Sequence, residues 1–128
     1  FDPETLDILV ITSDPFAVEG INSVSDLPDD YYLQAWEVLG DDNKKLGFTE
    51  VAWSSLEYFG GERAQAEFIN HLTGRLTADQ DIPLQFLAWW SLYDLDNDPH
   101  LTGMISQDFR KKPLYMAWKK LFDSTRKK

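Results

Sequence analysis

Three nearly continuous apolar runs constrain the fold of this chain more than any other feature. They are LDILVIT (residues 6–12), the stretch 46–53 and LQFLAWW (residues 84–90), which begin about 40 residues apart. Short runs that are apolar on both faces and rich in β-branched or aromatic residues are typical of strands in a parallel sheet, which is covered on both faces. The sequence therefore predicts three buried strands.

Helical periodicity occurs between these runs and after the last one. Apolar side chains recur three or four residues apart near residues 29–39, 61–76 and 113–125, which is the spacing of one face of an α-helix. Pro28 precedes the first of these ranges and two aspartates begin it, and Pro113 suits the first position of the last helix. Each range is predicted to be a helix.

The resulting order is βαβαβα, which places the chain in the α/β class. Such alternation implies parallel strands joined by right-handed crossovers. Two architectures fit: a small open sheet, or consecutive units of a TIM (β/α)8 barrel. A complete barrel takes roughly 250 residues, so the 128 residues here would form part of one. Because no glycine-rich phosphate loop follows any strand, the nucleotide-binding kind of open sheet is disfavoured.

Charge and hydropathy exclude two classes of partner. The formal net charge is −10, and eight of the twelve Lys and Arg residues lie from Arg110 onward. The rest of the chain is therefore strongly acidic, so no nucleic-acid partner is predicted. No apolar run approaches the roughly 20 residues of a membrane span, so no membrane partner is predicted either.

No metal site or cofactor is predicted. The chain has no cysteine, which excludes thiolate ligands and cysteine nucleophiles. The segment DLDND, residues 94–98, suggests a calcium loop, but Pro99 replaces the required glycine and Ile105 the closing glutamate. His71 and His100 have no nucleophile pattern around them, so no chemical role is predicted for either.

Chemically useful side chains gather where the three predicted strands end. The carboxyl ends of parallel strands are where functional groups collect in α/β proteins. The candidates there are Asp14, Glu50, Trp53, Trp89, Trp90 and Tyr93. Carboxylates beside tryptophans are the composition of a sugar site, because a pyranose stacks on an aromatic ring while acid groups act at the anomeric carbon.

These candidates also have structural interpretations. A buried carboxylate is costly unless it is paired, so Glu50 could be a half-exposed strand residue paired with Lys or Arg. Trp89 and Trp90 leave opposite faces of one strand, so at least one of them is expected to pack beneath a helix. Asp14 precedes a proline and could cap a turn.

Taken in order, five segments resemble the last three βα units of the retaining glycoside hydrolase barrels. The segments are LDILVITSDPF, KLGFTEVAWSS, AQAEFINHL, FLAWWSLYDL and LTGMISQDFRKKPLYMAWKKL. These enzymes form the 4/7 superfamily (clan A), which includes the endo-β-1,4-galactanases. The resemblance covers nearly the whole chain and implies strands six to eight of a TIM barrel.

The resemblance implies roles for individual residues. The nucleophile of these enzymes is a glutamate at the end of the seventh strand, which corresponds to Glu50 and would form the glycosyl-enzyme. A tryptophan at the end of the eighth strand forms the floor of the subsite that holds the reacting sugar. This tryptophan corresponds to Trp89, with Trp90 as the alternative. The closing pattern of the family corresponds to Gly103, Lys112 and Pro113.

Two departures from the family concern the second carboxyl group. Relatives often have a tyrosine at the position of Asp14, and a second carboxylate beside Glu50 would change the mechanism or mark lost activity. The acid/base glutamate of the family follows the fourth strand, which lies outside these three units. Because retaining hydrolysis needs two carboxyl groups about 5.5 Å apart, Asp14 is the candidate on a neighbouring strand.

The sequence therefore predicts retaining hydrolysis of β-linked sugars at a site that is incomplete in these 128 residues. A carbohydrate substrate is the expected ligand, and the rest of the barrel or a second copy of the chain is the expected protein partner. The resemblance implies a secreted or periplasmic location. Two alternatives are a non-catalytic carbohydrate-binding or scaffold relative and a free-standing three-layer α/β domain unrelated to sugars.

Overall fold

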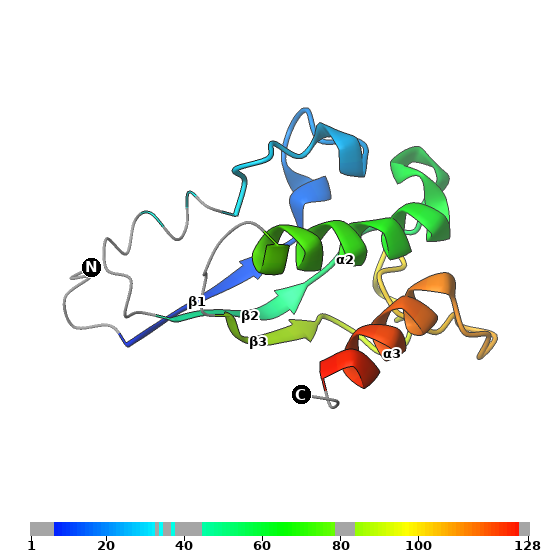
Figure 1. Ribbon diagram of the computed structural model, residues 1–128. Helices are drawn as coiled ribbons and strands as arrows, with labels where there is room; N and C mark the ends of the chain where they lie inside the picture. Colours follow the sequence, from blue (N-terminus) through cyan, green and yellow to red (C-terminus); the bar gives the residue numbers. More distant parts are fainter. Residues whose placement is uncertain (1–6, 33, 35–36, 38–44, 79–83, 126–128) are drawn as a thin grey trace.

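The three predicted strands form one parallel sheet. The structure, a computed structural model, describes residues 7–32, 34, 37, 45–78 and 84–125. Strands β1 (Ile8–Ser13), β2 (Lys45–Val51) and β3 (Leu84–Trp89) lie side by side in the order β1-β2-β3 (Figure 1). Both strand pairs are parallel. The α/β class and the parallel strands predicted from the sequence are confirmed.

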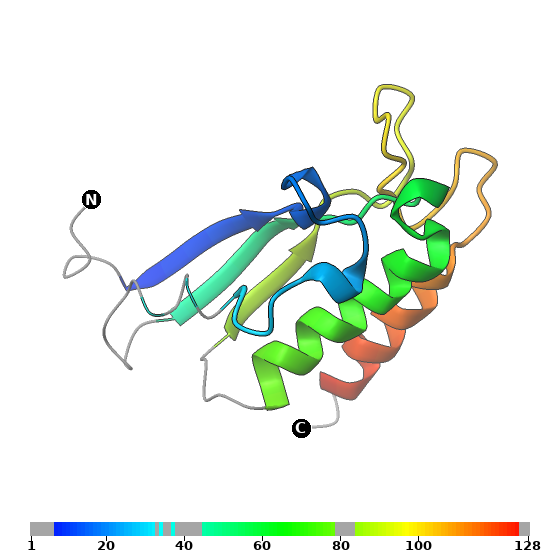
Figure 2. The ribbon, with the colours of Figure 1, turned by 90° about the horizontal axis from the view of Figure 1, so that it is seen from above.

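Two α-helices cover one face of this sheet. Helices α2 (Gly61–Ala78) and α3 (Pro113–Thr125) lie side by side on the same side of the strands (Figure 2). Single 3-10 turns occur at η2 (Pro15–Ala17), η3 (Val24–Asp26) and η4 (Glu57–Phe59). The helix expected near residues 29–39 lies mostly outside the described residues.

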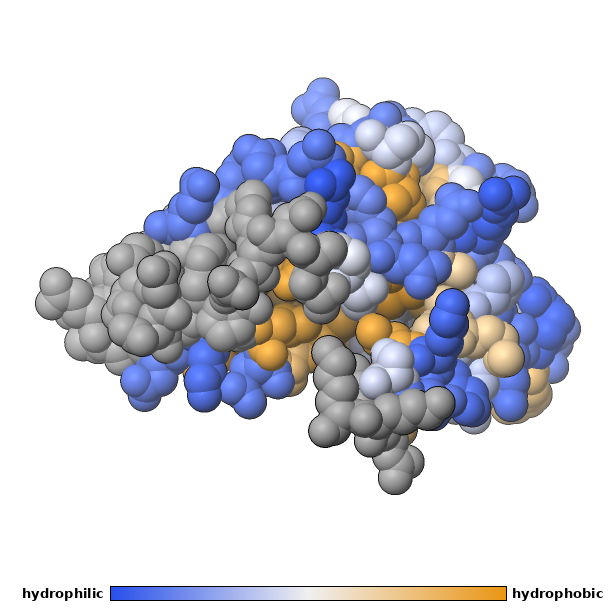
Figure 3. Space-filling model, in the orientation of Figure 1, coloured by the Kyte–Doolittle hydropathy of each residue, from blue (hydrophilic) through white to orange (hydrophobic). Residues whose placement is uncertain are grey.

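The core fills the layer between the sheet and the helices. Phe48 of β2, Phe68 and Leu72 of α2, and Leu114 of α3 have no exposed surface. Complete burial of one such apolar side chain contributes roughly 1.5–3 kcal/mol. In the space-filling view, hydrophobic residues show between the helices and strands within a mostly hydrophilic outline (Figure 3).

The opposite face of the sheet is apolar and is covered by no helix in the described part of the chain. Alternate strand positions leave Val10 46%, Phe86 37% and Trp90 50% exposed. The ring of Phe86 lies across Gly47, where a Cβ would come within 2.5 Å of Phe86 Cζ. Parallel sheets are normally covered on both faces, and exposed apolar residues on such a face are typical of an interface.

A buried ion pair ties the end of the sheet to the start of α3. Lys112 Nζ lies 2.7 Å from Asp94 Oδ1, and the two side chains are only 2% and 4% exposed. The same ammonium group donates to Ser55 Oγ at 3.0 Å and to the Leu101 carbonyl at 2.7 Å. Three acceptors therefore match its three N–H donors. The pair joins the segments that follow β2 and β3 to the first turn of α3.

Gly103 packs directly against the chain at Tyr93 and Asp94. A Cβ at residue 103 would lie 2.2 Å from Asp94 N, closer than any side chain allows. The Gly103 N–H donates to Asp94 Oδ1 at 2.9 Å, the oxygen that also accepts from Lys112. Glycine is the residue that permits such an approach of two backbones. Gly103 and Lys112 thus share one carboxylate, and Pro113 begins α3.

Loss of the Lys112 ammonium group should strongly destabilise the full chain. Lys112→Met leaves Asp94 buried without its cation, which costs about 3–5 kcal/mol. The control is Lys119→Met, because the Lys119–Asp123 pair is 57% and 51% exposed and such pairs contribute about 1 kcal/mol or less. Urea unfolding measures both. An equal decrease in the free energy of unfolding for the two variants would contradict the structural importance of the buried pair.

Residues 1–128 on their own should self-associate through the apolar face that carries Val10, Phe86 and Trp90. Exposed apolar patches larger than a few hundred Å² usually mark interfaces. Sedimentation velocity should show species larger than a monomer, and a hydrophobic dye should bind. The double substitution Val10→Lys and Phe86→Lys should reduce both signals. A compact, dye-negative monomer would contradict this role of the face.

Candidate functional site

A small cavity lies at the carboxyl ends of the strands. Its volume is about 250 Å³. Three of the residues predicted for the site, Asp14, Glu50 and Trp90, line it together with Asp98 and His100. The remaining lining residues are Thr12, Phe16 and Ala52. The cavity thus combines carboxylates, an indole and an imidazole at the edge of the sheet where α/β proteins place their ligands.

An irregularity in β2 determines the position of Glu50. Ile11 pairs with Phe48, but the next pair is Thr12 with Glu50, so Thr49 is an extra residue in β2. Bulges of this kind re-aim side chains next to functional sites. Thr49 and Glu50 are both exposed, although the rest of the strand end is buried. Among the described residues, the Glu50 carboxylate has no ion-pair or hydrogen-bond partner, so the paired interpretation finds no support there.

Asp14 stands at the start of η2. The backbone carbonyl of Asp14 accepts a hydrogen bond from Ala17 N at 2.9 Å, whereas the Asp14 side chain makes no capping hydrogen bond. The turn is therefore formed by the backbone, and the exposed carboxylate is left to line the cavity. Burial, together with the negative charge of Asp14, raises the pKa of Tyr31.

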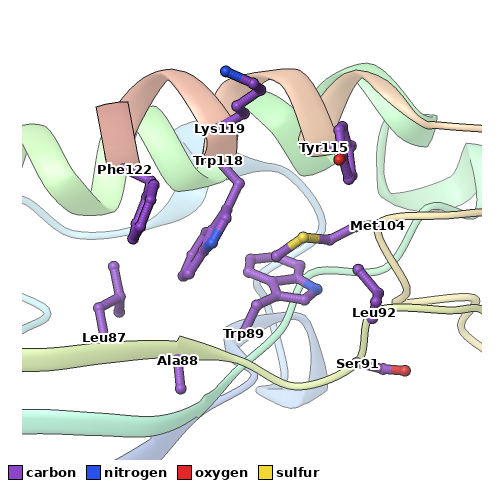
Figure 4. Close-up of a pocket in the computed structure, with 10 residues that line it drawn as sticks. All are labelled: Leu87, Ala88, Trp89, Ser91, Leu92, Met104, Tyr115, Trp118, Lys119 and Phe122. Carbon is purple, nitrogen blue, oxygen red and sulfur yellow. The ribbon is translucent and has the colours of Figure 1, made fainter. Parts of the chain in front are cut away.

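Trp89 and Trp90 take opposite sides of the sheet, in the reverse of the preferred assignment. Trp89 points toward α3 (Figure 4), with its ring 6.3 Å from that of Trp118. Its Nε1 donates to the Thr102 carbonyl at 2.8 Å. Trp90 is half exposed and lines the cavity with Glu50. The preference for Trp89 as the residue facing the site is corrected: Trp90, the alternative, faces it.

Two further predicted site residues lie away from the cavity. Trp53 is fully buried, stacks on Phe68 with ring centroids 4.9 Å apart and donates through Nε1 to the Phe59 carbonyl at 3.1 Å. Tyr93 is 43% exposed and its ring lies 6.1 Å from that of Phe109. Trp53 therefore belongs to the core, and Tyr93 forms part of a loop surface outside the cavity.

Asp98 organises the loop that carries His100 to the cavity. Its Oδ1 accepts from His100 N at 2.9 Å, and its Oδ2 accepts from Thr102 N and Thr102 Oγ1 at 2.8 and 2.5 Å. Burial alone would raise the pKa of Asp98, but these hydrogen bonds hold it below its ordinary value. Sequence reasoning considered residues 94–98 only as a calcium loop and missed this role.

Two of the three carboxylates of the 94–98 loop are engaged within the protein. Asp94 pairs with Lys112, and Asp98 binds backbone and hydroxyl groups of its own loop. Within the described ranges, no group of three His, Asp or Glu side chains is placed to hold a metal ion. In the same part of the chain, none of the helices has the length and apolar character needed to cross a membrane.

Comparison with solved structures identifies the architecture. A β-glucuronidase from Bifidobacterium dentium, complexed with coumarin-3-O-glucuronide, matches 94% of the chain with a TM-score of 0.70 at 13% sequence identity. The fold of the chain is that of part of a TIM barrel, as in this glycoside hydrolase. This confirms, at the level of fold, the resemblance that the five sequence segments carry. The chain corresponds to 21% of that β-glucuronidase.

Two other glycoside hydrolase barrels give the same result. A β-1,3-glucanosyltransferase from Rhizomucor miehei, as an active-site mutant with laminaritriose, matches 87% of the chain with a TM-score of 0.59 at 15% identity. Xylanase 10B from Thermotoga petrophila, in complex with xylobiose, matches 80% with a TM-score of 0.51 at 17% identity. The chain covers 43% and 34% of these two structures. No protein-family model matches the chain, and no curated protein matches it.

The two neighbouring tryptophans should differ in their contribution to stability. Trp89→Ala removes a ring that packs against Phe68 and Trp118, so it should lower the free energy of unfolding by about 3–5 kcal/mol. Trp90→Ala should cost less than about 1 kcal/mol, because its ring is half exposed on the cavity side. Chemical unfolding of the full chain measures both. A larger loss for Trp90→Ala would contradict the observed orientation.

Proposed function

We propose that this chain provides the nucleophile side of a retaining glycoside hydrolase site for β-linked sugars. The observation that carries the proposal is the position of Glu50, which is exposed at the end of β2 and shares one cavity with Asp14 and Trp90. The glycoside hydrolase barrel fold supports it, because catalytic groups of such barrels lie at the carboxyl ends of the strands. The structure and the comparisons support the fold; the reaction is our proposal.

In the proposed reaction, a Glu50 oxygen attacks the anomeric carbon. The bond from that carbon to the leaving oxygen breaks, and the leaving oxygen takes a proton from an acid. Water then releases the sugar from the glycosyl-enzyme. The indole of Trp90 offers an apolar face against which the pyranose can stack. Trp90 replaces Trp89 in this role because Trp90 lines the cavity and Trp89 packs beneath α3.

The second carboxyl group comes from Asp14 or from the part of the barrel outside this chain. Asp14 directly follows β1, the strand next to β2, and lines the same cavity as Glu50, and its carboxylate makes no capping hydrogen bond. Asp98 is less suited to proton transfer, because hydrogen bonds from His100 and Thr102 already occupy both of its oxygens. The remaining strands of the barrel are proposed to cover the apolar face that carries Val10 and Phe86.

A non-catalytic carbohydrate-binding relative is the second candidate. Asp14 favours it, because this position often carries a tyrosine in the glycoside hydrolases that the sequence resembles. Such a protein would keep Trp90 as a stacking surface and would bind sugar without turnover. The two candidates differ in whether Glu50 forms a covalent bond with the sugar.

Covalent labelling separates these candidates. The complete enzyme, in which the rest of the proposed barrel accompanies residues 1–128, is incubated with a panel of activated 2-fluoro glycosides of β-linked glucose, galactose, mannose and xylose, and the labelled peptide is identified by mass spectrometry. An adduct on Glu50 supports the hydrolase. Sugar binding measured by calorimetry without any adduct or turnover supports the binding protein. An adduct on another carboxylate would contradict the assignment of the nucleophile.

Glu50→Gln should abolish nearly all turnover and leave the fold intact. The amide has almost the shape of the carboxylate but cannot form the glycosyl-enzyme, so kcat should fall by roughly 1,000-fold or more. Glu57→Gln is the matched control, because Glu57 is an exposed residue of η4 that does not line the cavity. Hydrolysis of 4-nitrophenyl β-glycosides and thermal melting are measured for both. Unchanged kcat in Glu50→Gln would contradict the proposed role.

A further inference from the structure

We propose that His100 is a substrate-binding residue that helps to select the sugar held over Glu50. This inference rests on the proposed function. His100 lines the cavity that contains Glu50, Asp14 and Trp90, although it comes from the loop after β3 rather than from a strand. Its imidazole therefore borders the space in which the sugar would lie.

The backbone of His100 is fixed from both sides. Its N–H donates to Asp98 Oδ1 at 2.9 Å. Its carbonyl accepts from Ser54 Oγ and from Ser55 N, each at 3.1 Å. These bonds connect the loop after β3 to the end of β2, which carries Glu50. The distance between His100 and Glu50 is thus determined by hydrogen bonds and not by the free motion of a loop.

The ring of His100 is also held in place, but its nitrogens are not used. Phe16 packs against the ring with centroids 4.9 Å apart, and Phe59 approaches it at 6.2 Å. Nδ1 is buried without a hydrogen-bond partner among the described residues. Nearly all buried polar atoms in proteins have a partner. A ring that is packed and anchored yet makes no side-chain hydrogen bond indicates a group kept for a ligand.

The chemistry of the cavity indicates which ligand group His100 would bind. Nδ1 is buried, so we assign Nε2 as the ring nitrogen that would reach a ligand in the cavity that His100 lines. A neutral imidazole nitrogen exchanges a hydrogen bond with a hydroxyl group in either tautomer. Asp14, Glu50 and Asp98 give the cavity a negative character that favours neutral hydroxyls over acidic groups. His100 is therefore assigned to one hydroxyl of a neutral sugar.

The experiment uses substitutions of His100 that distinguish the loss of packing from the loss of a hydrogen bond. The complete enzyme, in which the rest of the proposed barrel accompanies residues 1–128, is assayed with 4-nitrophenyl β-glycosides of glucose, galactose, mannose and xylose, and the sugar with the highest kcat/KM is chosen. His100→Phe keeps an aromatic ring against Phe16 but removes both nitrogens. His71→Phe is the matched control, because His71 lies on α2 and does not line the cavity. Thermal melting is recorded for every variant.

We expect His100→Phe to lower kcat/KM roughly tenfold or more, the loss of about one hydrogen bond to the substrate, with little change in melting temperature. The same comparison is made with monodeoxy derivatives of the chosen substrate, each of which lacks one hydroxyl group. On the derivative that lacks the hydroxyl bound by His100, wild type and His100→Phe should have equal kcat/KM. His71→Phe should leave kcat/KM unchanged on every substrate. Equal kcat/KM for wild type and His100→Phe on the chosen sugar would overturn the inference.

A second pair of variants covers the case in which His100→Phe melts early. His100→Leu and His100→Gln both lose the aromatic packing, but the Gln amide can bind a hydroxyl near the position of Nε2. Higher kcat/KM for His100→Gln supports the inference, and equal values overturn it. Failure of the proposed function is distinguishable: wild type would then hydrolyse no glycoside of the panel and label with no 2-fluoro glycoside, which removes both proposals.

Discussion

The buried pair of Lys112 and Asp94 is the interaction on which the arrangement of the strand ends depends. Two charges are stable in this position because every partner is supplied: Ser55 Oγ, the Leu101 carbonyl and Gly103 N complete the network. A buried pair without such partners would be destabilising. The network joins the segment after β2 to the loop after β3, so the walls of the cavity keep their relative positions. Glu50 lies at the end of β2, just before the first of these segments, and His100 lies on the second.

The two faces of the sheet differ in how they are covered. Phe48 and Val51 point into the helix layer and are fully buried, whereas Val10, Phe86 and Trp90 remain exposed on the other side. One face is thus stabilised by α2 and α3 within the described part of the chain. The other face has no such cover in the described part of the chain, which corresponds to 21–43% of the matched structures.

Elements with strong periodicity could be predicted from the sequence, and so could residues that directly follow them. The three strands are apolar on both faces, which is why their positions, and with them Glu50 and Asp14, follow from the pattern alone. The orientation of Trp89 and Trp90 could not be predicted in this way. The β2–β3 register shifts between Phe48 and Val51, so the side that each indole faces depends on how two distant strands pair. His100 was missed because its place in the cavity results from hydrogen bonds of Asp98, Ser54 and Ser55.

The shared carboxylate of Asp94 also has a consequence for recombination between barrels. Gly103 and Lys112 meet at the same Asp94 oxygen, and Gly103 has no room for a Cβ against the chain at residue 93. Residues 94–112 therefore form one structural unit that is held together at a single carboxylate. A chimera with a crossover between residues 94 and 112 would take Asp94 and Lys112 from different parent barrels. A crossover within α3 would keep Asp94, Gly103 and Lys112 from the same parent. Shuffled libraries of such barrels should retain viable members mainly at the second kind of junction.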